Sequence, residues 1–159
     1  WEQSIQPVIN LGKRLVILRT GPVLSRKGGM LPPFIRPLRF GLATILGSGK
    51  QILSWIHIHD IVNMYIHAIG QPGVSGIYNA VSPNPVSNRD FVMELAKTRN
   101  GKWFIPVRVP SLVLKGLFGE MSTEVLKSTK VSAEKIMQSG FLFRYPGIGE
   151  ALKDLSGKE

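Results

Sequence analysis

Two histidines with one residue between them form the pair best suited to chemistry in this chain. His57 and His59 fall on one face of a predicted strand, a spacing that could offer two imidazoles to one metal ion. No third ligand stands out, because His67 lies within a predicted helix and Asp60 is better placed to cap that helix. We therefore expect no metal site. His59 is expected to bond backbone or solvent, and His57, beside Trp55, is expected to face a cleft.

Motifs of nucleotide binding and catalysis are incomplete or absent. Gly47-Ser48-Gly49-Lys50 resembles the end of a phosphate loop, but Thr44 stands where the first glycine is needed and Gln51 where Ser or Thr is needed. The glycine fingerprint of dinucleotide binding does not occur. No tyrosine is followed four positions later by lysine, and no serine or carboxylate pair has support from spacing. The sequence predicts no catalytic residue, so the chain alone should be inactive.

A binding candidate lies after an apolar run. Leu15 to Leu18 is typical of a strand buried on both faces of a parallel sheet, and Arg19, Thr20 and Gly21 follow it directly. In open parallel sheets, ligands bind beyond the carboxyl ends of the strands. Arg19 is therefore a candidate anion ligand. The alternative is an arginine that caps the strand end and pairs elsewhere.

Charge is distributed unevenly along the chain. The net charge is +10, and no Asp or Glu occurs between Gln3 and His59, whereas eight Lys or Arg residues do. Such a stretch should attract anions: the phosphates of a dinucleotide or nucleotide sugar, nucleic acid, or an acidic domain. The alternative is a basic protein with solvated lysines. Nucleic acid is disfavoured, because no recognised binding module and no basic run interleaved with aromatics occurs.

Composition bounds the class and the compartment. The chain has 159 residues, of which 43% are hydrophobic and 19% charged, which is typical of a globular domain. It has no cysteine, no uncharged apolar run of the ~20 residues that a membrane span needs, and no visible signal peptide. We expect a cytoplasmic protein without a membrane partner.

Hydrophobic periodicity predicts alternating strands and helices, and hence an α/β fold. Strands are expected at Leu15–Leu18, Gln51–His59, Gly76–Val81 and Phe104–Val107. A first helix is expected to end near Leu11, and a second to cover Met30–Leu42 with a break at Pro37. Two longer helices are expected, one from Asp60 to Ile69 and one from a cap at Ser87 or Asn88 to Thr98. Shorter helices are expected at Ser111–Phe118, Thr123–Ser128, Ser132–Ser139 and Ile148–Leu155.

Several segments together resemble one enzyme superfamily. Three groups of segments resemble extended short-chain dehydrogenase/reductases. They are Leu18-Arg19-Thr20-Gly21 with Val23-Leu24-Ser25, Ser54-Trp55-Ile56-His57-Ile58 with Asp60-Ile61-Val62, and Asn79-Ala80 with Pro83-Asn84-Pro85-Val86. Three further segments are similar to one subfamily, known as NAD-dependent epimerase/dehydratase or nucleoside-diphosphate-sugar epimerase. These segments are Leu46-Gly47-Ser48-Gly49, Gly119-Glu120-Met121 and Gly140-Phe141-x-Phe143-Arg144-Tyr145-Pro146. Its members include proteins linked to cell or plastid division, and they end in a small helical domain.

The resemblance implies that this chain is the C-terminal half of such a protein. Residues 1–109 would form the C-terminal part of a Rossmann-type parallel sheet, and 110–159 a small, mostly helical, substrate-side lobe. The cofactor loop and the catalytic Tyr/Lys pair of the family would precede Trp1. The cofactor would be NAD or NADP and the substrate a small or sugar-like molecule. By this resemblance the cofactor-binding residues are Thr20, Gly21 and Val23, and the substrate-binding residues are Arg19, Trp55, His57 and Asn79.

Two interpretations of the whole protein remain open. In the first, the parent protein is an NAD(P)-dependent epimerase or dehydratase-like oxidoreductase. In the second, it is a binding or regulatory module that keeps the fold without redox chemistry. Leu53 and Ser54 stand where sugar-nucleotide epimerases often carry a phosphate-binding arginine. In both cases a strand at Leu15–Leu18 would lack neighbours, so we expect exposed apolar surface and a partner, either the N-terminal half or a second copy.

Overall fold

The strands of this protein pair with distant strands rather than with their neighbours in sequence. The computed structural model describes residues 2–5, 7–110 and 128–156. The first elements are η1 (Glu2–Ile5), α1 (Pro7–Asn10), β1 (Val16–Thr20), β2 (Val23–Leu24), α2 (Pro32–Leu38), β3 (Leu42–Leu46), β4 (Ile52–Leu53) and β5 (Ile56–His57). They are followed by α3 (Ile58–Gly70), β6 (Gly76–Ala80), β7 (Val86–Ser87), α4 (Asn88–Asn100), β8 (Ile105–Val109), α7 (Glu134–Gln138) and α8 (Ile148–Ser156).

Three of the four strand pairs are parallel. β1 pairs with β6 from Val16↔Gly76 to Thr20↔Ala80, β3 pairs with β8, and β2 pairs with β5. β4 and β7 form the antiparallel pair. Parallel pairs require long crossover connections, and α2, α3 and α4 lie in those connections. The predicted α/β class is therefore confirmed.

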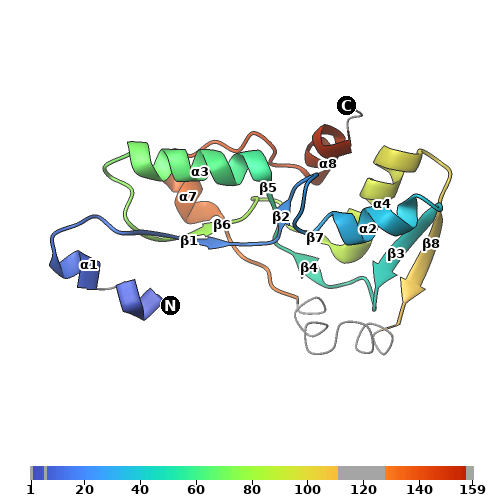
Figure 1. Ribbon diagram of the computed structural model, residues 1–159, viewed down its shortest axis with the longest axis horizontal. Coiled ribbons are helices and arrows are strands. Elements are labelled where there is room, and N and C mark those ends of the chain that lie inside the picture. The colour runs from blue at the N-terminus through green and yellow to red at the C-terminus, as the bar shows by residue number, and fades with distance from the viewer. Residues whose placement is uncertain (1, 6, 111–127, 157–159) are drawn as a thin grey trace.

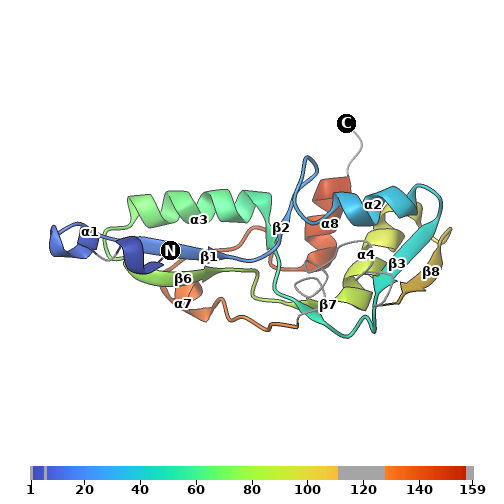
Figure 2. The ribbon, with the colours of Figure 1, turned by 60° about the horizontal axis from the view of Figure 1, so that its bottom comes forward.

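The pairs are spread along the long axis of the molecule (Figure 1). β1 and β6 lie toward one end, and Figure 2 shows α3 on one side of them and α7 on the other. β3 and β8 lie at the opposite end beside α2 and α4, and α8 stands between the two ends. The turned view in Figure 2 shows the same order.

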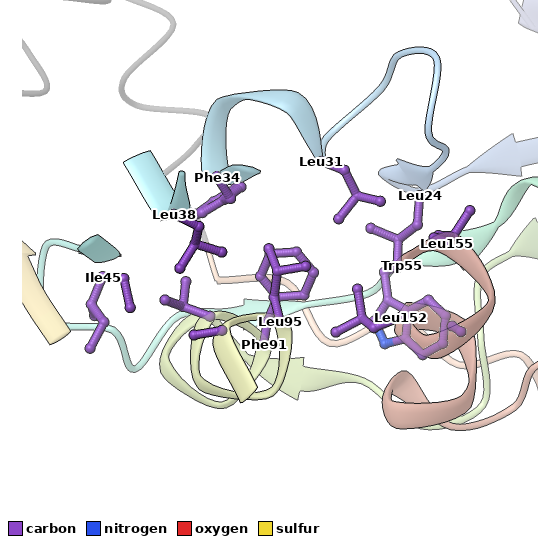
Figure 3. Close-up of a cluster of buried hydrophobic side chains, with 14 of the residues drawn as sticks. Leu24, Leu31, Phe34, Leu38, Ile45, Trp55, Phe91, Leu95, Leu152 and Leu155 are labelled. Carbon is purple, nitrogen blue, oxygen red and sulfur yellow. The ribbon is translucent and has the colours of Figure 1, made fainter. Parts of the chain in front are cut away.

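Two hydrophobic clusters hold these elements together. The larger joins α2, β3, α4 and α8, and Figure 3 shows Phe34, Trp55, Phe91 and Leu152 among its members. The rings of Phe34 and Phe91 meet edge to face, with centroids 5.2 Å apart. The second cluster lies between α3, β6 and α7 and includes Met64. The last two helices therefore pack in different places: α7 packs on β6, and α8 packs on α4.

The segment around His57 differs from the prediction of one strand, Gln51–His59, followed by a helix capped by Asp60. The strand hydrogen bonding of this segment is interrupted at Ser54 and Trp55. β4, before them, pairs with β7, whereas β5, after them, pairs with β2. α3 begins at Ile58, and its N-cap is His57, whose ring Nδ1 accepts the backbone N–H of His59 at 3.1 Å.

Asp60 has a different role from the predicted cap. Its carboxylate accepts the backbone N–H groups of Arg144 (2.8 Å) and Tyr145 (3.0 Å). Asp60 is 1% exposed, and its bond to Tyr145 is buried whereas its bond to Arg144 is partly buried. The first turn of α3 is thereby tied to the loop that precedes α8.

Other predictions agree more closely. Ser87 caps α4, where its hydroxyl accepts the backbone N–H of Asp90 at 3.1 Å. α2 runs from Pro32 to Leu38, so it is shorter than the predicted Met30–Leu42, and it continues one residue beyond Pro37 rather than breaking there. The helices predicted at Ser111–Phe118 and Thr123–Ser128 lie outside the described residues, apart from Ser128, which is not helical. The division at 109/110 stays a prediction.

Exposed apolar side chains gather in two places. α3 exposes Val62, Tyr65, Ile66 and Ile69, which share one face at spacings of three and four residues. A second group lies on β3, β8 and the turns before them. No described helix is long and apolar enough to cross a lipid bilayer.

Candidate functional site

The carboxyl ends of β1 and β6 bring together residues that are far apart in sequence. In the parallel register Arg19 lies opposite Asn79, and Thr20 lies opposite Ala80. The Gly21 N–H continues the pairing by donating to the Ala80 carbonyl at 3.2 Å. The structure therefore places Arg19, Thr20, Gly21 and Asn79 at one edge, where open parallel sheets bind ligands.

Gly21 is held by close approach of the backbone. A Cβ added there would lie 2.2 Å from the Ser54 carbonyl oxygen and 2.8 Å from Val81 Cγ1. No other residue type fits without movement of the chain. The Gly21 turn is thereby packed against the segment that links β4 to β5. The half-buried Val23 follows, paired with Ile56 and accepting the Met30 N–H at 3.1 Å.

Arg19 has a partner within the described chain. Its guanidinium donates two hydrogen bonds to the Glu2 carboxylate, from Nε at 2.7 Å and from Nη2 at 2.6 Å. The Arg19 bond lowers the pKa of Glu2, and the same contact raises the pKa of Arg19. Both side chains are substantially exposed, and exposed ion pairs contribute little and are screened by salt. An anionic ligand could therefore compete with Glu2 for the guanidinium.

Asn79 contacts the C-terminal part of the chain. Its side-chain Nδ2 donates to the Ser132 carbonyl at 3.1 Å. Lys135, from α7, lies over the Tyr78 ring at 4.5 Å and donates to the Ile77 carbonyl at 2.7 Å. The described start of the C-terminal segment thus lines the same strand that carries Asn79.

Trp55 and His57 require a correction. Both side chains were expected on a cleft wall, but both residues are 0% exposed. Trp55 belongs to the larger hydrophobic cluster, and its Nε1 donates to the Asn84 carbonyl at 3.1 Å. The physical reason is that α8 packs against both: Trp55 lies in one cluster with Leu152 and Leu155, and His57 faces Asp154.

His57 forms a polar cluster that the sequence did not reveal. Its Nε2 lies 3.4 Å from Asp154 Oδ2, and Tyr145 donates its hydroxyl to Asp154 Oδ1 at 2.8 Å. The His57 and Tyr145 rings are stacked at a tilt, with centroids 4.1 Å apart. No spacing links the three residues, because His57 ends β5, Tyr145 precedes α8 and Asp154 lies within α8.

The cluster shifts the pKa of each member. Burial lowers the pKa of His57, although the nearby Asp154 opposes this. The Tyr145 hydrogen bond lowers the pKa of Asp154, and the same bond raises the pKa of Tyr145. A 3.4 Å contact is too long for a strong hydrogen bond, so His57 Nε2 is a buried polar atom with a poor partner.

His57 and Asp154, together with His59, could also form a metal centre. One ligand atom each from His57, His59 and Asp154 lies within 4.8 Å of the others. His57 Nδ1, however, accepts the His59 N–H, so the proton of the neutral ring is on Nε2. A metal-binding imidazole instead donates from its second nitrogen. Within the described residues, this geometry favours a neutral His57 that faces Asp154 over a metal ligand.

The chain is similar in sequence to known proteins. Residues 109–155 match a domain of unknown function, DUF1731. The chain is 39% identical to epimerase family protein SSP1921 of Staphylococcus saprophyticus over 158 residues, which is 98% of this chain and 51% of that protein. It thus spans about half the length of the curated relatives it matches.

Solved structures agree. The human epimerase family protein SDR39U1, determined with NADPH, is 33% identical with a TM-score of 0.84 over 91% of this chain and 48% of its own. A nucleoside-diphosphate sugar epimerase from Corynebacterium glutamicum is 32% identical with a TM-score of 0.74, over 99% of this chain and 29% of its own. The fold is that of Rossmann-like epimerases. More narrowly, the chain resembles the C-terminal part of epimerase family proteins, as its motifs predicted.

Proposed function

We propose that this chain is the substrate-side part of an NAD(P)-dependent epimerase- or dehydratase-like oxidoreductase. The observation that supports this most is the edge formed by Arg19, Thr20 and Gly21 opposite Asn79, with Gly21 packed too tightly for any side chain. A relative with 33% identity was determined with NADPH, which supports a nicotinamide cofactor. We place the protein in the cytoplasm.

The residues at this edge divide into two groups. Thr20, Gly21 and Val23 would contact the nicotinamide side of the cofactor through the turn after β1. Arg19 and Asn79 would contact a small or sugar-like substrate, with Arg19 exchanging Glu2 for a substrate anion. The buried Trp55 and His57 would act indirectly, by holding the Ser54 carbonyl against Gly21.

Catalysis would depend on the N-terminal part of the parent protein. Two features support a contact between that part, or a second copy, and this chain. β1 has β6 as its partner among the described strands, which leaves its second edge open. α3 exposes the face of Val62, Tyr65, Ile66 and Ile69.

The alternative is a binding or regulatory module without redox chemistry. The Arg19–Glu2 ion pair favours it, since the candidate anion ligand is occupied without any substrate. The same pair is exposed and exchangeable, so we prefer the enzymatic proposal.

A cofactor-binding experiment separates the two. The full-length parent protein should bind NADPH, measured by nicotinamide fluorescence and by a rise in melting temperature, and residues 1–159 alone should show neither binding nor turnover. No binding by the full-length protein at millimolar cofactor would favour the module. Turnover by residues 1–159 alone would refute the division of roles. Arg19→Gln should weaken substrate binding without affecting NADPH affinity, with the exposed Arg99→Gln as the matched control.

A further inference from the structure

The end of the molecule farthest from β1 has an exposed apolar surface. We call it the aromatic end and define it by Phe40, Leu42, Trp103, Ile105 and Val107. Phe40 is 83% exposed and Trp103 87% exposed. Isolated exposed apolar residues are common, but five that adjoin one another indicate a contact surface.

Strand register makes the group contiguous. Leu42 lies opposite Ile105, and Thr44 lies opposite Val107, so these side chains share one face of the β3–β8 pair. The other face carries the buried Ala43 and Ile45. The Ile105 N–H donates to the Gly41 carbonyl at 2.8 Å, which sets the Phe40 turn beside the Trp103 turn.

The two chain segments that form the aromatic end carry basic residues and no acidic ones. The segments 31–46 and 95–110 contain no Asp or Glu, and they carry the exposed residues Arg36, Arg39, Lys97, Arg99, Lys102 and Arg108. Asn100 Nδ2 donates to the Leu38 carbonyl at 2.9 Å, which ties the basic end of α4 to the basic end of α2. Among the described residues, only Lys97 of these six has a carboxylate within 4.0 Å, that of Glu94.

Several occupants fit this surface poorly. Strand addition at the outer edge of β8 is hindered, because Ile105 directs its N–H toward β3 and the outward position is Pro106, which has no N–H. A second copy would bring a like-charged surface into contact. The N-terminal part of the relatives would extend the sheet at β1, at the opposite end in Figures 1 and 2.

We propose that the aromatic end docks on an anionic lipid surface. The Phe40 and Trp103 rings would enter the interfacial region, where Trp is favoured, and the six basic side chains would contact lipid phosphates and carboxylates. This is adsorption and not spanning, so it revises the expectation of no membrane partner without requiring a transmembrane segment. Leu42, Ile105 and Val107 favour lipid over nucleic acid, which offers no aliphatic environment to them.

Vesicle binding by the full-length parent protein tests the proposal. Sedimentation with vesicles of phosphatidylcholine and phosphatidylserine should recover the protein, whereas vesicles of phosphatidylcholine alone should not. Binding should weaken with added salt. Removing one basic residue should weaken partitioning about fivefold, so Arg39→Gln with Lys102→Gln should weaken it about 25-fold. Lys13→Gln with Lys153→Gln, elsewhere on the surface, is the matched charge control.

The apolar contribution needs its own variant. Trp103→Ser should abolish sedimentation, whereas Leu142→Ser, also at a residue 87% exposed, should retain it. Circular dichroism should be unchanged in both variants, because neither side chain is packed. The proposal is overturned if anionic vesicles recover no protein, if both serine variants lose binding equally, or if Trp103→Ser instead abolishes self-association or RNA binding. None of these readouts depends on NADPH, so the result is independent of the proposed enzymatic role.

Discussion

The most informative single perturbation is Asp60→Ala. Asp60 is the third residue of α3 and 1% exposed, and its two oxygens accept the backbone N–H groups of Arg144 and Tyr145. Removing the carboxylate leaves both amides without a protein acceptor. A buried donor left unsatisfied costs about 1–3 kcal/mol, so we expect a loss of about 3 kcal/mol in the free energy of unfolding.

Asp90→Ala is a matched control for this variant. Asp90 is the third residue of α4, which like α3 has 13 residues, and it is exposed. Both substitutions remove a carboxylate from a first helical turn, so each variant also loses a favourable interaction with the helix dipole. The Asp90 variant should lose about 0.5–1 kcal/mol, and the difference measures the long-range acceptor role of Asp60.

Urea unfolding of the full-length protein measures the loss, and amide hydrogen exchange locates it. In Asp60→Ala the amides of Arg144 and Tyr145 should exchange faster, while Asp90→Ala leaves them protected. Equal losses of stability in the two variants, or unchanged protection of the two amides, would show that Asp60 acts merely as a local helix residue.

Two further substitutions test the site. Gly21→Ala should lower the free energy of unfolding by about 1–3 kcal/mol, because its Cβ would lie 2.2 Å from the Ser54 oxygen. Gly73→Ala, where a Cβ meets nothing within 4 Å, is the control, and equal melting temperatures would contradict the packing argument. Burial lowers the pKa of His57, so the unfolded chain takes up a proton that the folded chain resists. The contribution of His57 to stability is therefore complete above pH ~6.5 and declines as the pH falls below it. His57→Asn, which keeps an acceptor for the His59 amide, should flatten the loss of stability between pH ~7 and ~5. The lowered pKa of Asp154 acts only below pH ~4, so parallel pH profiles for wild type and His57→Asn would refute this role of His57.

Local signals in the sequence were sufficient for much of the fold. The apolar run before Arg19 predicted β1, and the spacing after Asn88 predicted α4 with Ser87 as its cap, because capping and periodicity act over a few residues. The motif ensemble was sufficient for the resemblance to epimerase family proteins, which the comparisons confirm.

Predictions failed where one segment had to serve two distant partners. Side chains from Gln51 to His59 alternate between two faces as in a single strand. The segment is nevertheless divided, because β4 pairs with β7 and β5 pairs with β2. Asp60 has the residue type and position of a cap, but its carboxylate is occupied by amides more than 80 residues away. Short-range spacing contains no information on such competition.

The same limit applies to the candidate site. By itself the sequence determined that Arg19, Thr20 and Gly21 follow a strand and that catalytic motifs are absent from the chain. Only the tertiary structure decided that Arg19 lies opposite Asn79 and pairs with Glu2, that Trp55 and His57 are interior, and that His57 meets Asp154. These outcomes depend on which strands are neighbours and on where α8 packs, and both follow from burial of apolar surface by residues distant along the chain.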